Sequence, residues 1–228
     1  MVAPINPDLF QTLNEKGQLK QLVYRNTLES FHLIKKTISE LNQEYKKKFD
    51  GDSKAIPFLH QDEGEFETRL QFAGDVLIFL MHTNIFEFSR YHEVMTTTYV
   101  REDKQRSYCG IINIYNFLAD SFKYSRLNDV GYLIGRIFVN KDKCYFIEGK
   151  REIGLLYNNF GKEILDEQAA RKIVESAILY TINFDLLTPP YDSLKEISLE
   201  EMKSIVDSYT LKTGKRLGFR FQADKVEE

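Results

Sequence analysis

Apolar residues recur every three or four positions along the first quarter of the chain, which is the spacing of one helical face. Between Gln18 and Phe49 this face comprises Leu28, Phe31, Ile34, Ile38, Leu41, Tyr45 and Phe49. Asn6-Pro7-Asp8 has the composition of a helix start, and Gly17 interrupts the pattern that follows it. The pattern predicts a helical segment after Asp8, a break at Gly17 and a long helix over residues 18–49.

A helix over residues 18–49 would be about 48 Å long at about 1.5 Å per residue, longer than the core of a typical domain. We therefore expect part of its apolar face to pack on a second copy of the chain, giving a homo-oligomer, most simply a dimer. The alternative is that the helix bends and frays. Lys46, Lys47 and Lys48 occupy its last turn, where cations complement the negative end of the helix dipole.

The middle of the chain has the period of two that is typical of strands. Phe66 to Phe72 alternates apolar and polar residues, whereas Val76 to Met81 is apolar throughout, as in a central strand covered on both faces. Asn140 to Lys143 has the composition of a hairpin turn. Strands are predicted over residues 66–72, 76–81, 86–88, 94–100, 132–139 and 144–148, with a short one over 153–157.

Two stretches are harder to interpret. Residues 50–64 are polar and predict a connection rather than a strand. In residues 109–124, Ile112 and Ile114 favour a strand, but Ile111, Tyr115, Leu118 and Phe122 have helical spacing. We favour a helix for 109–124, because the stripe extends beyond the length of an ordinary strand.

The last third of the chain has helical patterns again. Asp166 can cap a helix that carries Ala170, Ile173, Val174 and Ala177 on one face, and Ser198 to Glu201 has the form of a capping box. A last edge strand is predicted over residues 216–221.

The whole order predicts an α+β fold, with a long N-terminal helix, an antiparallel sheet of about 5–7 strands covered by helices, and two C-terminal helices. We expect one domain over 1–228, divided into a helical segment (1–50), a mainly β core (65–160) and C-terminal helices (164–213).

Composition narrows the function classes only slightly. The 228 residues carry 31 basic and 34 acidic side chains, so extensive contact with nucleic acid is not expected. The N-terminus has no signal-like pattern, and the longest apolar run has six residues, far fewer than the roughly 20 that cross a membrane. Together with only two cysteines outside any CxxC motif, this predicts a cytoplasmic protein without a membrane segment.

Several side chains are candidates for binding. His60, Asp62 and Glu63 place an imidazole and two carboxylates within four residues, a set that could hold a metal ion. His82 ends the most apolar strand, and Arg90 and His92 follow eight to ten residues later. If the chain reverses between them, these three could bind a small anion.

Arg136 lies in an otherwise apolar strand beside Gly135, where a ligand could approach the backbone closely.

A further pair is Glu148 and Lys150, which follow a strand and lie after Asp129 and Asp142. This order is similar to the metal-binding core of the PD-(D/E)xK nucleases, where carboxylates hold Mg²⁺ and a lysine positions water. The chain departs from that pattern because it has no Pro-Asp and Asp142 lies in a hairpin turn. The motifs GxGxxG, GxxxxGK[ST] and GxSxG are missing from the sequence, and no cofactor is expected.

The sequence therefore favours a binding, sensing or interaction module that self-associates through its N-terminal helix and has a small-molecule or protein partner. The alternative is a metal-dependent hydrolase or nuclease that uses the His60 loop or the Glu148 and Lys150 pair. A purely structural partner of another protein is the third hypothesis.

Overall fold

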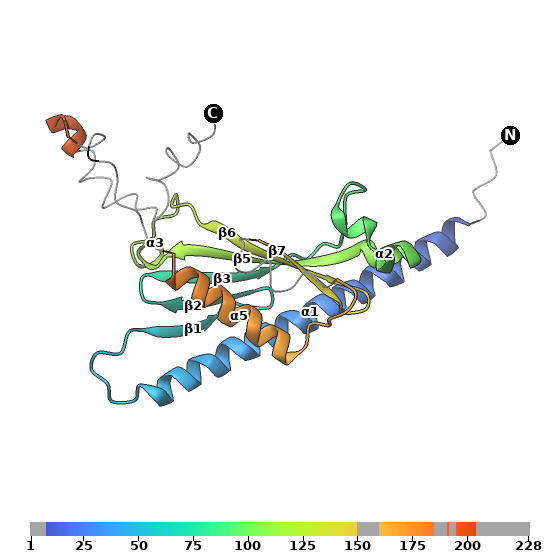
Figure 1. Cartoon of the computed structure of the whole chain (residues 1–228), viewed down its shortest axis with the longest axis horizontal. Coiled ribbons are helices and arrows are strands. Elements are labelled where there is room, and N and C mark those ends of the chain that lie inside the picture. Colours follow the sequence, from blue (N-terminus) through green and yellow to red (C-terminus); the bar gives the residue numbers. More distant parts are fainter. Residues whose placement is uncertain (1–7, 150–159, 185–190, 192–194, 204–228) are drawn as a thin grey trace.

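The computed structural model describes residues 8–149, 160–184, 191 and 195–203. It is a mixed α+β structure with one long N-terminal helix and an antiparallel sheet, as the sequence predicts (Figure 1). The longer helices are α1 (Leu9–Lys48) and α5 (Glu167–Ile182). The strands are β1 (Phe58–Asp62), β2 (Glu67–Phe72), β3 (Asp75–Met81), β4 (Phe86–Glu87), β5 (Tyr108–Leu118), β6 (Tyr132–Asn140) and β7 (Tyr145–Gly149). The short helices are η1 (Glu93–Thr96), α2 (Thr98–Glu102), η2 (Lys104–Ser107) and α3 (Ala119–Lys123).

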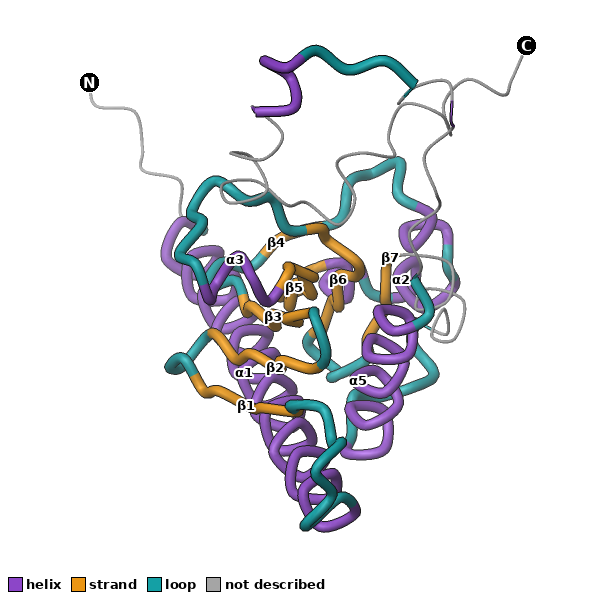
Figure 2. The backbone as a smooth tube through the Cα atoms, turned by 90° about the vertical axis from the view of Figure 1, so that its left-hand side faces the viewer, coloured by secondary structure: helices purple, strands orange, loops and turns teal. Residues whose placement is uncertain are grey.

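The seven strands form one sheet in the order β1-β2-β3-β5-β6-β7, and β4 pairs with the start of β5. Every pairing is antiparallel, which short connections between successive strands allow. Helices α1 and α5 lie against the same face of this sheet, as Figures 1 and 2 show together. They are joined by ion pairs of Lys36 with Glu167 and of Arg171 with Glu44.

The main core lies between the sheet and these two helices. Alternate residues of each strand point toward it, so that β2 contributes Leu70 and Phe72 while Arg69 and Gln71 face away. Helix α1 contributes Phe31, Ile34 and Ile38 to this core, and all three are fully buried. The helical face predicted for residues 28–41 is therefore the face that packs on the sheet.

A second core covers part of the opposite face of the sheet. The segment η1-α2-η2 lies over β5, β6 and β7 and encloses mostly aromatic and aliphatic side chains. Its buried members are Phe88, Val94, Val100, Cys109, Cys144, Phe138, Phe146 and Phe160. Burial raises the pKa of the Cys109 thiol to about 12, so this cysteine behaves as an apolar core residue.

Helix α1 is continuous through Gly17, which corrects the predicted break. Its 40 residues correspond to a length of about 60 Å, and its first turns extend beyond the sheet (Figure 1). A glycine in a helix costs only about 1 kcal/mol relative to alanine, and a side-chain hydrogen bond from Gln18 to Asn14 bridges this turn. The three lysines predicted for its last turn lie there.

Three other predictions were wrong in secondary structure. Residues 109–124 are mainly strand β5, and only residues 119–123 are helical. Residues 94–100 form η1 and the start of α2 rather than a strand. The supposed connection at 50–64 contains the edge strand β1.

Other predicted elements are confirmed. The β6–β7 hairpin and its turn lie where they were expected, and Asp166 caps α5 by accepting a hydrogen bond from the Ala169 amide. Ser198 and Glu201 form the reciprocal bonds of a capping box at residues 199–203. The predicted strands at 153–157 and 216–221, and the rest of the second C-terminal helix, lie outside the described residues.

Candidate functional site

The predicted metal-binding residues lie on or beside the edge strand β1, and each has a partner within the protein. The Nε2 atom of His60 lies 2.9 Å from the Thr68 hydroxyl, and Asp62 pairs with Lys35 at 2.6 Å. Glu63 lies 3.4 Å from the Arg69 guanidinium. The described residues contain no group of three or more His, Cys, Asp or Glu side chains that could hold a metal ion.

Their electrostatics agree with these pairings. The hydrogen bond from the Lys35 ammonium lowers the pKa of Asp62, so the carboxylate stays ionised at neutral pH. Burial lowers the pKa of His60 because it disfavours the imidazolium form.

His82, Arg90 and His92 are not brought together. His92 accepts a hydrogen bond from the Val94 amide at the start of η1, and its ring packs on Phe88 with 4.6 Å between centroids. His82 is exposed beyond the end of β3. Within the described part of the chain, no hydrogen bond, ion pair or ring contact joins the three side chains.

Arg136 lies on the face of the sheet opposite α1. It forms an ion pair with Glu148, its cross-strand neighbour on β7, and its guanidinium lies 5.4 Å from the Phe138 ring centroid. The pair leaves Arg136 about as exposed as an ordinary surface residue, with 40% of its side chain accessible. It is therefore an ordinary cross-strand pair.

The carboxylates of the nuclease-like pattern are also held by other groups. Asp129 accepts a hydrogen bond from the Ser121 hydroxyl at 2.6 Å, and Asp142 binds Tyr99 and Arg106. Glu148 is paired with Arg136, while Lys150 lies outside the described residues. Nothing in the described residues gathers these carboxylates around one point.

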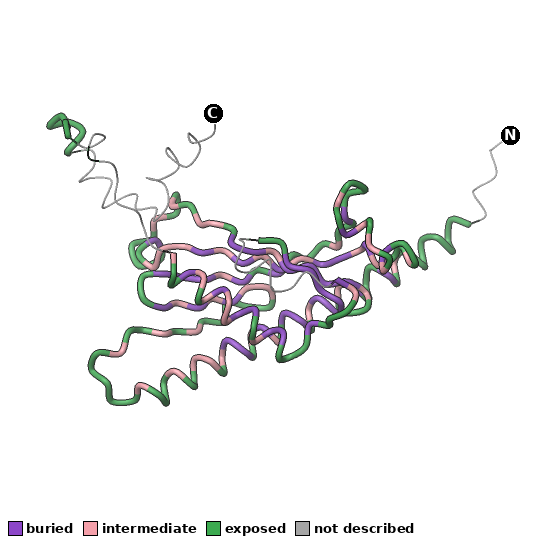
Figure 3. The backbone as a smooth tube through the Cα atoms, viewed as in Figure 1, coloured by how far each residue is buried: buried purple, intermediate pink, exposed green. Residues whose placement is uncertain are grey.

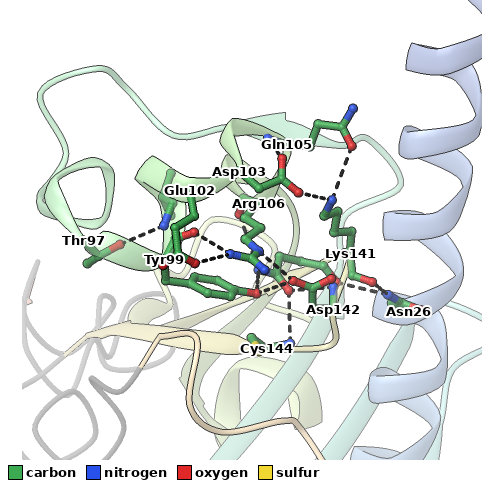
Figure 4. A network of polar contacts seen from close by, with 12 residues as sticks. Asn26, Thr97, Tyr99, Glu102, Asp103, Gln105, Arg106, Lys141, Asp142 and Cys144 are labelled. Atoms are coloured by element: carbon green, nitrogen blue, oxygen red, sulfur yellow. Dashed lines mark hydrogen bonds and ion pairs between the residues drawn. The ribbon is translucent and has the colours of Figure 1, made fainter.

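A dense polar network surrounds the β6–β7 turn (Figure 4). At its centre Asn140, which is fully buried, accepts hydrogen bonds from the Asp142 and Cys144 amides and donates to the Tyr99 hydroxyl. Tyr99 donates to Asp142 at 2.7 Å, and Arg106 lies over the Tyr99 ring at 4.3 Å.

The same network ties three elements together. Asn26 of α1 donates to the Asn140 and Lys141 carbonyls, and Lys141 pairs with Asp103 at the start of η2. Its ion pairs and hydrogen bonds are made within the protein, which is the arrangement of a structural anchor. We name this set, with Asn140 at its centre, the Asn140 network.

A cleft lies between α1 and the turn after β3. Its volume is about 780 Å³, within the range of about 300–1,000 Å³ that is typical of small-molecule sites. Helix α1 lines it with Lys20, Gln21, Tyr24 and Arg25. The turn lines it with Thr83, Asn84, Ile85 and Phe86. We name it the α1 cleft.

His82 holds the shape of the turn that forms one wall of this cleft. Its Nδ1 atom accepts a hydrogen bond from the Asn84 backbone amide at 3.0 Å. Its ring makes a T-shaped contact with the Phe86 ring, with 4.8 Å between centroids. Its place at the end of β3 therefore makes it a positioning residue beside the site. Of the predicted binding residues Arg90, His92 and Arg136, none lines the cleft.

Sequence reasoning missed the cleft, although one signal was present. Leu13, Lys20, Thr27, Ile34 and Leu41 follow one another at seven-residue intervals, so they share one face of the helix. Lysine is the one charged residue in this series, and a charge on an apolar face needs either a partner or solvent. Lys20 is exposed and lines the cleft.

The apolar face of α1 continues past the cleft, where no described residue covers it. Leu19 and Val23 are buried, whereas Leu9, Phe10 and Leu13 are 50%, 76% and 65% exposed. Figure 3 shows the helix changing from buried to exposed toward its N-terminal end. On the side of the same turns away from Leu9 and Leu13, Gln11 donates to Glu15 and Gln18 donates to Asn14. The first turns of α1 are therefore amphipathic but are not packed against described residues.

Comparisons with known proteins give no relative: no family model, no curated protein and no solved structure matches this chain. Among the described residues, no helix combines the length and apolar character needed to cross a membrane.

Proposed function

We propose that this protein is a binding and interaction module that self-associates through the first turns of α1. The observation that carries the proposal is the exposure of Leu9 and Leu13 on the helical face that is buried farther along α1, with Phe10 exposed beside them. Burying a large apolar side chain contributes about 1.5–3 kcal/mol. In a homodimer in which two such segments cover each other, both copies would gain this free energy of burial.

The polar face of the same segment supports a helix-to-helix contact. The pairs Gln11 with Glu15 and Asn14 with Gln18 join residues four apart, and such pairs stabilise an exposed helix by about 0.2–0.5 kcal/mol each. The segment is thus helical before it meets a partner, so association orders little additional backbone. A second copy has the same stripe and is self-complementary under two-fold symmetry.

We also propose that the protein works in the cytoplasm. Support comes from Cys109 and Cys144, which are free thiols enclosed in the second core, as is usual in reducing compartments. The metal-dependent alternative is not proposed, because the described members of its two residue sets are engaged with other side chains.

Light scattering coupled to size-exclusion chromatography tests the self-association. We expect a dimer at about 10–100 µM, which corresponds to a dissociation free energy of about 5.5–7 kcal/mol. The double variant Phe10→Glu/Leu13→Glu should be monomeric with an unchanged circular dichroism spectrum. The control Gln11→Lys alters the opposite face of the same turns and should remain dimeric. A wild-type monomer throughout this range, or a dimer that survives the double substitution, would overturn the proposal.

A further inference from the structure

We propose that the α1 cleft binds a small phosphate monoester with an aromatic or heterocyclic body. The phosphate would lie between Lys20 and Arg25, and its body would rest on Phe86. This inference is independent of self-association, since it rests on the cleft's own charges and shape.

The charged side chains that line the cleft are all positive. Lys20 and Arg25 line it, and no described carboxylate does. Neither cation forms an ion pair within the described part of the chain. Elsewhere on the folded body cations with carboxylate partners are common; they are Lys35, Lys36, Arg69, Arg106, Arg136, Lys141, Lys143 and Arg171. Two cations without carboxylate partners in one cleft thus form a local positive site in a concave surface.

Two cations match a dianion better than a monoanion. A phosphate monoester carries a charge of about −1.5 to −2 at neutral pH, whereas a carboxylate carries one charge. Arginine can bind two phosphate oxygens through its planar fork, and lysine binds phosphate as a point charge. The Asn84 and Gln21 amides and the Thr83 hydroxyl on the same walls can donate further hydrogen bonds to phosphate or hydroxyl oxygens.

The apolar lining indicates the rest of the ligand. Phe86 is 36% exposed although the His82 ring makes a T-shaped contact with it, so part of the ring remains open to a ligand. Tyr24 and Ile85, both partly buried, line the same cleft. A flat ring stacked on Phe86 would bury apolar surface at little entropic cost. Phe86 is already fixed, because it begins β4, which pairs with β5, and the His82–Asn84 hydrogen bond holds the turn before it.

Phenyl phosphate is the smallest probe that has both parts, and benzoate and phenol are its matched controls. Titration of the full chain followed by amide chemical shifts should show saturable binding at Lys20–Arg25 and Thr83–Phe86. We expect a dissociation constant of about 1 mM or lower for phenyl phosphate, and binding of benzoate at least about tenfold weaker because one charge is lost. Phenol should give no saturable shift.

Variants assign the site. Lys20→Gln and Arg25→Gln should each weaken phenyl phosphate binding by about tenfold, since each removes a charge-assisted hydrogen bond. Lys16→Gln lies one turn earlier on α1 and should change it less than about twofold. The monomeric Phe10→Glu/Leu13→Glu variant should bind as the wild type does. Lack of phenyl phosphate binding, equal or tighter binding of benzoate, or binding indifferent to the Lys20 and Arg25 substitutions would each overturn the inference.

Discussion

The Asn140 network and the α1 cleft are both polar, but their polar groups have opposite surroundings. In the network a fully buried asparagine makes hydrogen bonds with both ends of its amide, and the nearby cations Arg106 and Lys141 have carboxylate partners. In the cleft, Lys20 and Arg25 face solvent without carboxylate partners among the described residues.

The difference separates a structural role from a binding role. Polar groups that satisfy one another fix the chain, and they lose much stability when one partner is removed. Polar groups that lie open in a concave surface add little to stability and are available to a ligand. Substitutions in the two regions should therefore have different effects, and the following predictions begin with the largest.

Removal of the Asn140 side chain should have the largest effect. Asn140→Ala removes the side-chain oxygen that accepts from the buried Cys144 amide and the partly buried Asp142 amide, and it removes the amide that donates to the Tyr99 hydroxyl. We expect the free energy of unfolding to fall by about 3 kcal/mol, measured by urea denaturation. Asn84→Ala in the cleft is the matched control and should cost less than about 0.5 kcal/mol. Equal losses in the two variants would show that the regions do not differ.

Gly161 tests the packing of the Tyr99 ring. It has a φ of +93°, and a Cβ atom there would lie 2.4 Å from Cγ of Tyr99. Gly64 has a φ of +112° and open space around it, so Gly64→Ala measures backbone strain alone. We expect Gly64→Ala to cost about 1 kcal/mol and Gly161→Ala about 1 kcal/mol more, because of the ring collision. If the two variants lose the same stability, the Tyr99 ring yields and does not anchor the segment.

The sequence predicted best those strands that are buried on one face. Strand β2 is the clearest case, because the buried residues Leu70 and Phe72 alternate with the partly exposed residues Arg69 and Gln71. Strand β5 was mistaken for a helix because both of its faces are partly covered. Ile112 and Ile114 enter the main core, while Cys109 and Ile111 belong to the second core on the other side. Burial on both faces removes the alternation that marks a strand.

The threonines at 96–98 show a second reason for error. Their β-branched side chains favour a strand, but the Thr96 and Thr97 hydroxyls donate to the Glu93 and Val94 carbonyls. Thr97 also caps α2 by accepting from the Val100 amide. Local side-chain hydrogen bonds of this kind outweigh strand propensity.

The candidate site was beyond sequence reasoning, apart from one residue. His82 was identified and borders the α1 cleft, whereas Lys20 was not singled out, although it is a charge on an apolar helical face. The cleft needs α1 and the turn at 83–86, which come together only through the packing of α1 across the sheet. No local pattern contains that information.

A smaller effect is expected at the rim of the network, where Asp103 pairs with Lys141. The hydrogen bond from Lys141 lowers the pKa of Asp103. The pair therefore stabilises the fold above the ordinary aspartate pKa of about 3.9, and this contribution is lost as the pH falls through the lower folded-state pKa.

The variant Asp103→Asn keeps an oxygen that can accept from the Gln105 amide but removes the charge. We expect a loss of about 0.5–1 kcal/mol at pH 7, which shrinks toward zero as the pH falls below the lowered folded-state pKa of Asp103. Urea denaturation over this pH range measures it, with the exposed Asp50→Asn as control. A difference that stays constant with pH would mean that the ion pair does not contribute.

The smallest effects on stability belong to the cleft cations. Lys20→Gln and Arg25→Gln remove charges that have no partner in the described part of the chain, and glutamine has nearly the helix propensity of lysine and arginine. We expect each to change the free energy of unfolding by less than about 0.3 kcal/mol.

The same variants make the comparison sharper when a ligand is present. Saturating phenyl phosphate should raise the melting temperature of the wild type, because a ligand that binds only the folded state stabilises it. It should have little effect on either variant. Asn84→Ala serves as an intermediate case, since it changes one neutral donor of the cleft and leaves both charges. A marked loss of stability in Lys20→Gln or Arg25→Gln without ligand would instead assign these cations to the fold, and the contrast with the Asn140 network would fail.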